Sequence, residues 1–253
     1  MGGAIAAKDA LIVNTPQKYA GLTGVEVRTG KEAVSLDAEK KTVAVKDVQT
    51  GNIEAFTYDK LVLAVGASPA ELPIEGKDLP GVFKMRTPDD AEGIRTYAEK
   101  NHVRKAVVIG AGFIGLEAAE NLKARGIDVT VIDFAPQILP NILDPEMAAY
   151  AQKHLMNSGI RVFTGTGASS VLGTDKVTGV STSEGTFPCE LLIMAAGIRP
   201  NTAFLEDTGI EMFKGTILVD SQMKTSLDDV YAAGDCVMVT NRITGKRQWS
   251  PMG

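Results

Sequence analysis

The most constraining feature of the chain is a glycine-rich turn between an apolar run and a segment rich in alanine, leucine and glutamate. Residues 105–122 have the sequence KAVVIGAGFIGLEAAENL, in which Gly110, Gly112 and Gly115 follow the pattern Gly-x-Gly-x-x-Gly. A strand, a tight turn and a helix start in this order are typical of a βαβ unit that binds a dinucleotide. Gly110 permits the turn, Gly112 lets a pyrophosphate approach the backbone, and Gly115 lets helix and strand pack closely. The helix start supplies N–H donors for the pyrophosphate.

A second apolar run, residues 128–132, ends in Asp133. Its distance from Gly110 is close to the spacing of about 20 residues at which such units place the acid that binds the adenosine ribose hydroxyls. We therefore expect NADH to be preferred over NADPH, because a 2′-phosphate would meet like charge and residues 134–137 offer no Arg or Lys. The alternative is that the glycines serve only a tight turn.

Composition excludes several classes of protein. The 253 residues carry a net charge of −5 and show no basic stripe, which argues against a nucleic-acid partner. The apolar runs are too short to span a bilayer, and the first 13 residues lack the basic start of a secretory signal. We expect a cytoplasmic protein with no membrane partner.

The cysteines and histidines indicate no metal site. Cys189 and Cys236 lie far apart in the sequence and form no Cys-x-x-Cys pair, so we interpret both as small buried residues. Neither His102 nor His154 has neighbours at ligand spacing. A hydrolase triad is equally unsupported.

The chain repeats two short motifs in the same order. GVEVRTG (24–30) resembles GIRVFTG (159–165), and LVLAVGASP (61–69) resembles LIMAAGIRP (192–200). The second motif is an apolar strand that ends in Ala-x-Gly-x-x-Pro, and a hairpin-like stretch with turn residues precedes it in both copies.

The repeat predicts the fold class. We expect an α/β protein with two Rossmann-like, three-layer domains, each with a small antiparallel β meander. In the second copy the glycine-rich loop precedes GIRVFTG, whereas the corresponding place before GVEVRTG lies outside the chain, so we expect the first domain to be incomplete. The expected boundaries are 1–103, 104–222 and a return segment of the first domain at 223–253. The alternative is an unrelated small β domain at the N-terminus.

The pattern also predicts the individual elements. We expect a short helix after Thr15-Pro16, strands and a hairpin over 24–69, and a loop connection before a helix from about 88 to 101. Residues 61–65 have the pattern of a central strand buried on both faces, so the loss of its neighbours in this chain should expose apolar surface and favour association. The second half should contain strand 106–110, helix 113–125, strand 128–133, helix 145–158, strand 160–163, a three-strand meander and strand 191–196, followed by strands 216–220 and 229–233.

Taken together, these motifs resemble the pyridine nucleotide-disulfide oxidoreductases, most closely the coenzyme A-disulfide reductase and NADH oxidase/peroxidase branch. The resemblance covers essentially the whole chain. It is carried by residues 110–117 (GAGFIGLE), the two Ala-x-Gly-x-x-Pro strand ends, residues 225–235 (TSLDDVYAAGD) and residues 245–253 (GKRQWSPMG). In this family the first domain binds FAD, the second binds NAD(P)H, and a C-terminal domain forms the dimer.

The resemblance implies a set of cofactor-binding residues. Asp235 is expected to bind the ribityl and phosphate region of FAD, the alternative being a plain strand end. Phe113 takes the place of an aromatic that covers the flavin and swings aside for nicotinamide, the alternative being core packing. The full set is Gly110, Gly112, Phe113, Ile114, Gly115, Glu117, Asp133 and Gly197 for NAD(P)H, and Gly66, Gly234 and Asp235 for FAD.

The chain also departs from the family. The first phosphate loop, the redox-active cysteine upstream of a pair like Gly2-Gly3, and the dimerisation domain have no counterpart, so no catalytic residue is assigned. We interpret Met1 as an internal methionine and expect the chain to be part of a longer, homodimeric protein. By itself it should bind NADH without FAD and without turnover.

The resemblance implies an FAD-dependent oxidoreductase that passes hydride from NAD(P)H to FAD and on to a disulfide, oxygen or peroxide. The substrate would be a small molecule or a disulfide. The alternatives are a non-catalytic NADH-binding module and a reductase of a small electron carrier such as rubredoxin or ferredoxin. The terminal acceptor stays open.

Overall fold

The computed structural model describes residues 8–251, which divide into two compact units. Unit 1 combines residues 8–13 with Pro69–Gly197, and unit 2 combines Asn14–Ser68 with residues 198–251. Met1, the Gly2-Gly3 pair and the last two residues of the closing motif lie outside the described residues.

Unit 1 is built on a five-stranded parallel sheet with the strand order β6-β13-β7-β8-β9. The short apolar runs of the sequence form its three central strands, as expected for strands that are covered on both faces. The strands are β6 (Val82–Lys84), β13 (Leu191–Met194), β7 (Lys105–Ile109), β8 (Asp128–Ile132) and β9 (Arg161–Phe163).

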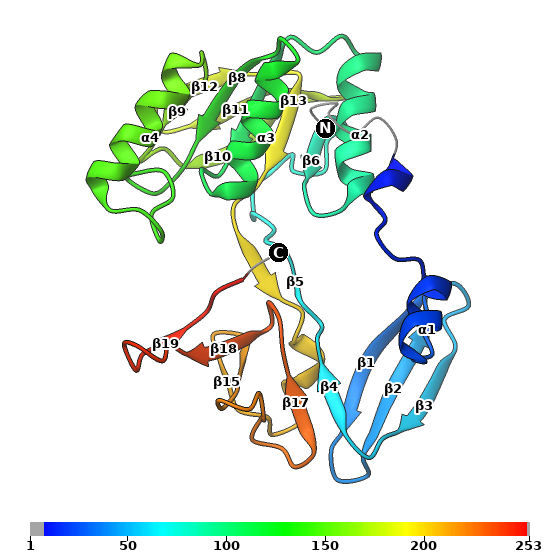
Figure 1. Cartoon of the computed structure of the whole chain (residues 1–253). Helices are drawn as coiled ribbons and strands as arrows, with labels where there is room; N and C mark the ends of the chain where they lie inside the picture. The colour runs from blue at the N-terminus through cyan, green and yellow to red at the C-terminus, as the bar shows by residue number, and fades with distance from the viewer. Residues whose placement is uncertain (1–7, 252–253) are drawn as a thin grey trace. The chain divides into compact units, whose positions relative to one another are not determined.

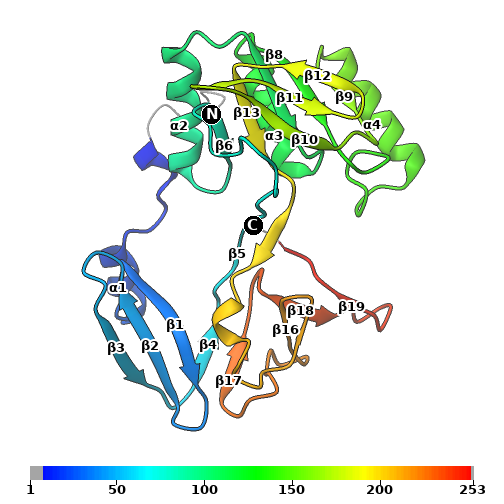
Figure 2. The same cartoon turned by 180° about the vertical axis from the view of Figure 1, so that it is seen from behind.

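Two different layers cover the faces of this sheet. Helices α2 (Pro88–Lys100), α3 (Phe113–Ala124) and α4 (Pro145–Asn157) lie on one face, and the antiparallel meander β10 (Ala168–Gly173), β11 (Val177–Thr182) and β12 (Gly185–Pro188) lies on the other (Figures 1 and 2). Because strand side chains alternate between faces, Val108 and Ile193 pack against the helices. Val107 and Leu192 pack under the meander. The predicted three-layer architecture is confirmed.

The predicted helices and strands of this unit are confirmed within two residues at each end. The helix starts follow from local chemistry. Thr87 and Asp90 form a capping box ahead of α2, and the Asp144 carboxylate accepts a hydrogen bond from the Met147 N–H (3.1 Å) at the start of α4.

Unit 1 also contains elements that the sequence did not predict, the 3₁₀ helix η1 (Lys8–Leu11) and strand β6. Strand β6 pairs in parallel with β13, and Ile94 of α2 is buried in the core of the same sheet. The second segment of unit 1 therefore begins at Pro69, whereas the sequence predicted a domain boundary at residue 104. Residues 198–222 belong to unit 2, where β16 (Thr216–Leu218) pairs with β18 (Val237–Thr240).

Unit 2 contains helix α1 (Pro16–Thr23) and several small sheets. Its core is formed by apolar side chains that include Leu36, Leu63, Val230 and Val237. The strands are the meander β1 (Lys31–Asp37), β2 (Thr42–Asp47) and β3 (Ile53–Thr57), the parallel pair β4 (Leu61–Leu63) and β17 (Val230–Ala232), the pair β5 (Ala67–Pro69) and β14 (Ile198–Pro200), and the sheet β15 (Met212–Phe213), β16, β18 and β19 (Arg247–Gln248), with the 3₁₀ turn η2 (Ala203–Leu205).

The repeat in the sequence corresponds to a repeat in the fold. In each copy a helix, α1 or α4, is followed by a left-handed glycine, Gly24 or Gly159, and then by a three-stranded meander and a strand that ends in Ala-x-Gly-x-x-Pro. One difference is that residues 161–163 form β9 whereas residues 26–28 form no strand. The reason is that β9 pairs with β8, while no strand of residues 8–251 pairs with 26–28.

The expected exposure of apolar surface at strand 61–65 is confirmed for β4. Val62 is 63% exposed, whereas Leu63 is buried. Within the described chain β4 pairs with one strand, β17, and the face that carries Val62 is open to solvent.

An ion-pair cluster joins three segments of unit 2. The Asp229 carboxylate accepts hydrogen bonds from Lys41 Nζ (2.6 Å) and Lys60 Nζ (3.0 Å). These two ammonium groups lower the pKa of Asp229 to about 2. Asp229 itself adopts a left-handed backbone (φ 60°), a conformation that Asp and Asn tolerate better than other residues with a side chain.

We predict that Asp229→Asn lowers the thermal midpoint by about 1–2 °C at pH 6, the scale of an exposed ion pair. Asn keeps the left-handed backbone and removes only the charge. Because the folded pKa lies below the unfolded value of about 3.9, the stabilisation is complete above about pH 4 and declines as the pH falls toward 2.

The measurement is the difference in midpoint between variant and wild type at pH 6 and at pH 3. Asp228→Asn is the matched control, because Asp228 is 97% exposed and lies 3.7 Å from Lys224. A difference that stays constant between the two pH values would contradict the role of the charge.

Candidate dinucleotide site

The first glycine of the loop allows a turn that no other residue fits. Gly110 follows β7 with φ 108°, and its N–H donates to the Ile132 carbonyl of β8 (2.8 Å). A Cβ atom at this position would clash with the carbonyl oxygen of Ala195. Both the backbone conformation and the lack of space therefore require glycine here.

The other two glycines shape the start of α3. A Cβ at Gly115 would clash with the Gly110 carbonyl, whereas a Cβ at Gly112 would meet no atom within 4 Å. Gly115 thus permits the close packing of helix on loop, as the sequence predicted. Gly112 is the N-cap and provides no side-chain hydrogen bond. The first turn of α3 therefore presents N–H groups and a positive dipole end beside an open surface.

Asp133 follows β8, and its carboxylate contacts the glycine loop. Oδ2 accepts a hydrogen bond from the Ala111 N–H (2.5 Å), and Oδ1 accepts one from the Ala135 N–H (2.7 Å). The side chain is half-buried. The structure thus brings the predicted acid beside the predicted phosphate loop, and it adds a direct bond between them that sequence spacing did not indicate.

The remaining unit 1 candidates lie at the same edge of the sheet. Gly197 follows β13 with φ 98°, and the Ala195 N–H donates to the Ile109 carbonyl (2.7 Å), which holds the end of β13 beside β7. The ends of β13, β7 and β8 are therefore adjacent. Ligands of parallel α/β sheets bind at this carboxyl edge.

Three candidates project from the first turns of α3. Phe113 is 61% exposed, and Ile114 and Glu117 are also exposed. The predicted exposure of Phe113 is confirmed, and the alternative of an ordinary core aromatic is not supported. Its role toward a flavin stays a prediction.

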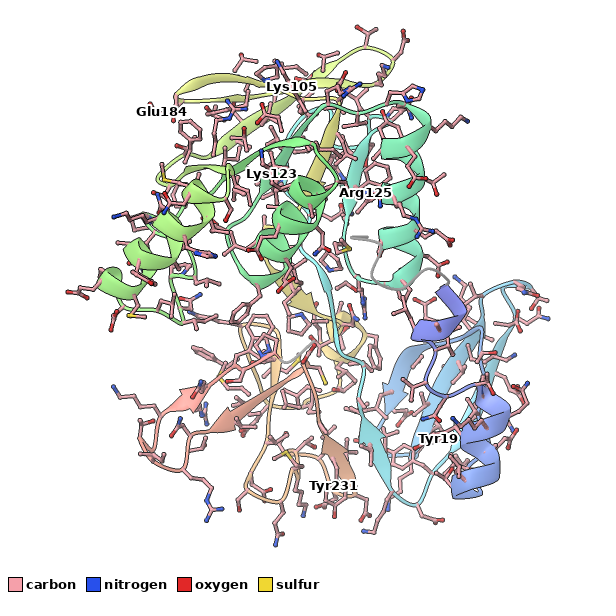
Figure 3. All side chains as sticks on the ribbon, turned by 45° about the horizontal axis from the view of Figure 1, so that its top comes forward. Tyr19, Lys105, Lys123, Arg125, Glu184 and Tyr231 are labelled. Carbon is pink, nitrogen blue, oxygen red and sulfur yellow. The ribbon has the colours of Figure 1, made fainter. Side chains whose placement is uncertain are left out.

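Basic side chains gather at the opposite edge of unit 1. Figure 3 labels Lys105, at the start of β7, and Lys123 and Arg125, at the end of α3. Cations at a helix C-terminus offset its negative dipole end. A cavity of about 320 Å³ lies at this amino edge, lined in part by Arg104 and Arg125, and is separate from the glycine loop.

The flavin candidates lie together within unit 2. Gly66 follows β4, and Gly234 and Asp235 follow the neighbouring parallel strand β17. The Ala233 N–H donates to the Leu63 carbonyl (3.0 Å), which joins the two strand ends. Asp235 is half-buried, and its backbone carbonyl accepts a hydrogen bond from Trp249 Nε1 (2.8 Å).

Both cysteines are buried, as predicted. Burial raises the pKa of Cys189 to about 12, and Cys236 Sγ contacts the carbonyl oxygens of Leu63 and Ala233. The raised pKa makes the Cys189 thiol a poor nucleophile. Among residues 8–251 no group of three or more acidic, cysteine or histidine side chains is arranged to hold a metal. No helix in that range has the length and apolar character needed to cross a bilayer.

Sequence reasoning missed two residues that hold the glycine loop. The Ala111 carbonyl accepts a hydrogen bond from the Leu139 N–H (3.0 Å), and Ala111 is fully buried. Leu139 has a left-handed backbone with φ 47°. No residue pattern indicates such a conformation at a leucine.

Comparison with known proteins gives a consistent result. The family model described as pyridine nucleotide-disulphide oxidoreductase matches residues 4–250. An NADH oxidase of Methanocaldococcus jannaschii is 41% identical over 251 residues, which cover 99% of this chain and 56% of the relative.

Two solved structures have the same fold. An NAD-dependent persulfide reductase from A. fulgidus is 36% identical with a TM-score of 0.93, over 99% of this chain and 47% of that one. An engineered water-forming NADPH oxidase, a mutant of the Lactobacillus brevis enzyme bound to NADPH, is 28% identical with a TM-score of 0.91, over 99% and 55%. The chain spans about half the length of these relatives. It belongs to the pyridine nucleotide-disulphide oxidoreductase family.

Proposed function

We propose that unit 1 binds NADH and that the chain serves an FAD-dependent oxidoreductase, in which hydride passes from the nicotinamide to the flavin and on to an acceptor. The observation that carries the proposal is the carboxyl edge of unit 1, where the glycine loop, the open start of α3 and Asp133 are adjacent. This edge is the place where α/β sheets bind nucleotides.

The residues of unit 1 fit a dinucleotide. A Cβ on Gly112 would occupy open surface at the helix start, so glycine leaves room for a pyrophosphate against the backbone. Each Asp133 oxygen accepts one backbone N–H and has a further lone pair for a ribose hydroxyl. NADH supplies the hydride, and these residues bind and orient it.

The residues of unit 2 fit part of a flavin cofactor. Gly66, Gly234 and Asp235 stand at adjacent strand ends, and a carboxylate at a strand end is a good acceptor for sugar hydroxyls. We propose that these residues contact FAD. Phe113, exposed at the start of α3, would lie at the nicotinamide end of the NADH site.

For the terminal electron acceptor we propose a chemical class. The relatives are an NADH oxidase and a persulfide reductase, which supports oxygen or a sulfur–sulfur bond as the group reduced. We also propose that the protein is cytoplasmic and, from the family resemblance, that its full-length form is a homodimer. A non-catalytic NADH-binding module is the alternative that the exposed dinucleotide site alone would equally support.

The preference for NADH follows from the charge of Asp133. A 2′-phosphate at the ribose would face this carboxylate, and residues 134–137 provide no cation. The NADPH-bound engineered relative carries five substitutions. A glycine and an aspartate are each replaced by Ala, the two residues after that aspartate by Arg and Ser, and a proline by Arg. The glycine, the aspartate and the proline of that relative have the same spacing as Gly115, Asp133 and Pro140 in this chain.

We predict that the chain binds NADH at least tenfold more tightly than NADPH, a difference of about 1.4 kcal/mol. Asp133→Ala should weaken NADH binding and narrow the gap between the two cofactors. Titration followed by nicotinamide fluorescence measures the dissociation constants of NADH and NADPH. Glu120→Ala, at an exposed position of α3 outside the set of cofactor-binding candidates, controls for a general change of surface charge. Equal or tighter binding of NADPH by the wild type would contradict the assignment of Asp133, and absence of NADH binding would contradict the proposed function.

A second prediction concerns Phe113. Because the side chain is 61% exposed, Phe113→Ala should destabilise the fold by less than about 1 kcal/mol. Truncation of a buried aromatic residue costs about 3–5 kcal/mol. Chemical denaturation measures the loss. Ile193→Ala, in the buried centre of the sheet, provides the contrast and should cost about 2–5 kcal/mol. A loss of core size at Phe113 would show that the ring packs inside the protein.

A further inference from the structure

The turn that follows Asp133 contains a strained residue. Leu139 has φ 47°, which is uncommon for a residue with a side chain, and Pro140 follows it, which restricts its backbone further. Strain of this kind persists where the surrounding structure enforces it, and it is frequent at functional sites. Leu139 is also close in sequence to the acid at the ribose position.

The surrounding contacts hold Leu139 in this conformation. Its carbonyl accepts hydrogen bonds from the Ile142 and Leu143 N–H groups (both 3.0 Å), and Gln137 Nε2 donates to the Leu143 carbonyl (2.9 Å). Ile138 is fully buried in the core between sheet and helices, and Leu139 and Leu143 pack against the same core. Residues 137–143 therefore form one anchored turn, which we name the 137–143 turn.

The strained backbone directs one N–H group at the glycine loop. The Leu139 N–H donates to the Ala111 carbonyl (3.0 Å), while the Ala111 N–H is bound by Asp133 Oδ2 (2.5 Å). The two peptide groups on either side of Ala111 are thus both fixed by partners outside the loop.

The consequence for a ligand follows from peptide geometry. The Ala111 carbonyl and the Gly112 N–H belong to the same planar trans peptide, so they point in opposite directions. When Leu139 binds the carbonyl, the Gly112 N–H must point away from the 137–143 turn. Gly112 borders open space at the start of α3, where an anion would bind.

We infer that Leu139 is a positioning residue for nucleotide binding, which orients the Gly112 N–H toward the pyrophosphate through the Ala111 peptide. This inference rests on the proposed function, because it assumes a dinucleotide at the glycine loop. In this role Leu139 acts through its backbone N–H and needs no contact with the ligand. Its contribution depends on its left-handed backbone and not on its side chain.

Two substitutions at one position separate these contributions. Leu139→Gly removes the side chain but adopts the left-handed backbone freely, so the N–H stays in place. Leu139→Val keeps an apolar side chain, but a β-branched residue strongly disfavours this backbone. We expect Leu139→Val to weaken the binding of NADH and of ADP about tenfold, the effect of about one hydrogen bond. Leu139→Gly should keep both affinities within about twofold, even if it lowers the denaturation midpoint.

The order of the two variants is the decisive result. If Leu139 served only to pack the core, the glycine variant would be the weaker binder and the valine variant close to wild type, and that order would overturn the inference. Equal binding by wild type and the valine variant would also overturn it. Wild-type protein that binds neither NADH nor ADP would instead contradict the proposed function.

Hydrogen exchange of the wild-type protein tests the hydrogen bond from the Leu139 N–H even if the valine variant does not fold. The Leu139 amide should exchange slowly and become still slower when NADH is bound, because the ligand stabilises the loop that accepts its hydrogen bond. Exchange as fast as at an exposed loop amide, or unchanged by saturating NADH, would contradict the inference.

Discussion

The carboxyl edge of unit 1 depends on one steric constraint, the passage of Gly110 beside the carbonyl of Ala195. The left-handed backbone at Gly110 and the absence of space for a Cβ force the chain out of the sheet at this residue. Helix α3 then starts three residues later, and Gly115 packs directly on the Gly110 carbonyl. The direction of the helix, and with it the N–H groups of its first turn, follows from contacts between backbone atoms. A site made in this way has little freedom to move when a ligand binds.

The same plan of strand end, glycine and acid occurs in both units. In unit 1 the glycine loop follows β7 and Asp133 follows its neighbour β8. In unit 2 Gly66 follows β4, and Gly234 and Asp235 follow its neighbour β17. Parallel strands present their carboxyl ends at one edge, so a glycine that opens space and an acid that accepts hydroxyl hydrogen bonds become adjacent. The sequence repeat around the two Ala-x-Gly-x-x-Pro motifs is a separate relation, because it makes Gly66 after β4 equivalent to Gly197 after β13.

Local sequence predicted those parts of the fold that local chemistry determines. The glycine loop, the capped helices and the apolar central strands were placed within two residues, because each carries its own signal. Strand β6 was missed because its three half-buried residues become a strand only by pairing with β13, more than 100 residues later. The apolar run at residues 61–63 does not indicate which face of β4 is covered, and the structure exposes Val62 while it buries Leu63. At the site, Gly110, Gly115 and Asp133 could be predicted, whereas Leu139 could not, since a left-handed leucine has no signature in the sequence.

Asp133 illustrates how one side chain can serve both the loop and the ligand. Each carboxylate oxygen already accepts a backbone N–H, from Ala111 and from Ala135. An asparagine could accept only one of these bonds, because its amide nitrogen would face the second N–H as another donor. The acid therefore supports the conformation of the loop before any ribose arrives. Its charge discriminates against a 2′-phosphate, but its hydrogen bonds keep the loop in shape for either dinucleotide. Removal of the acid thus relieves the repulsion of the NADPH 2′-phosphate and at the same time loosens the phosphate loop that binds both dinucleotides. A variant without the acid therefore loses its preference for NADH together with part of its affinity for NADH.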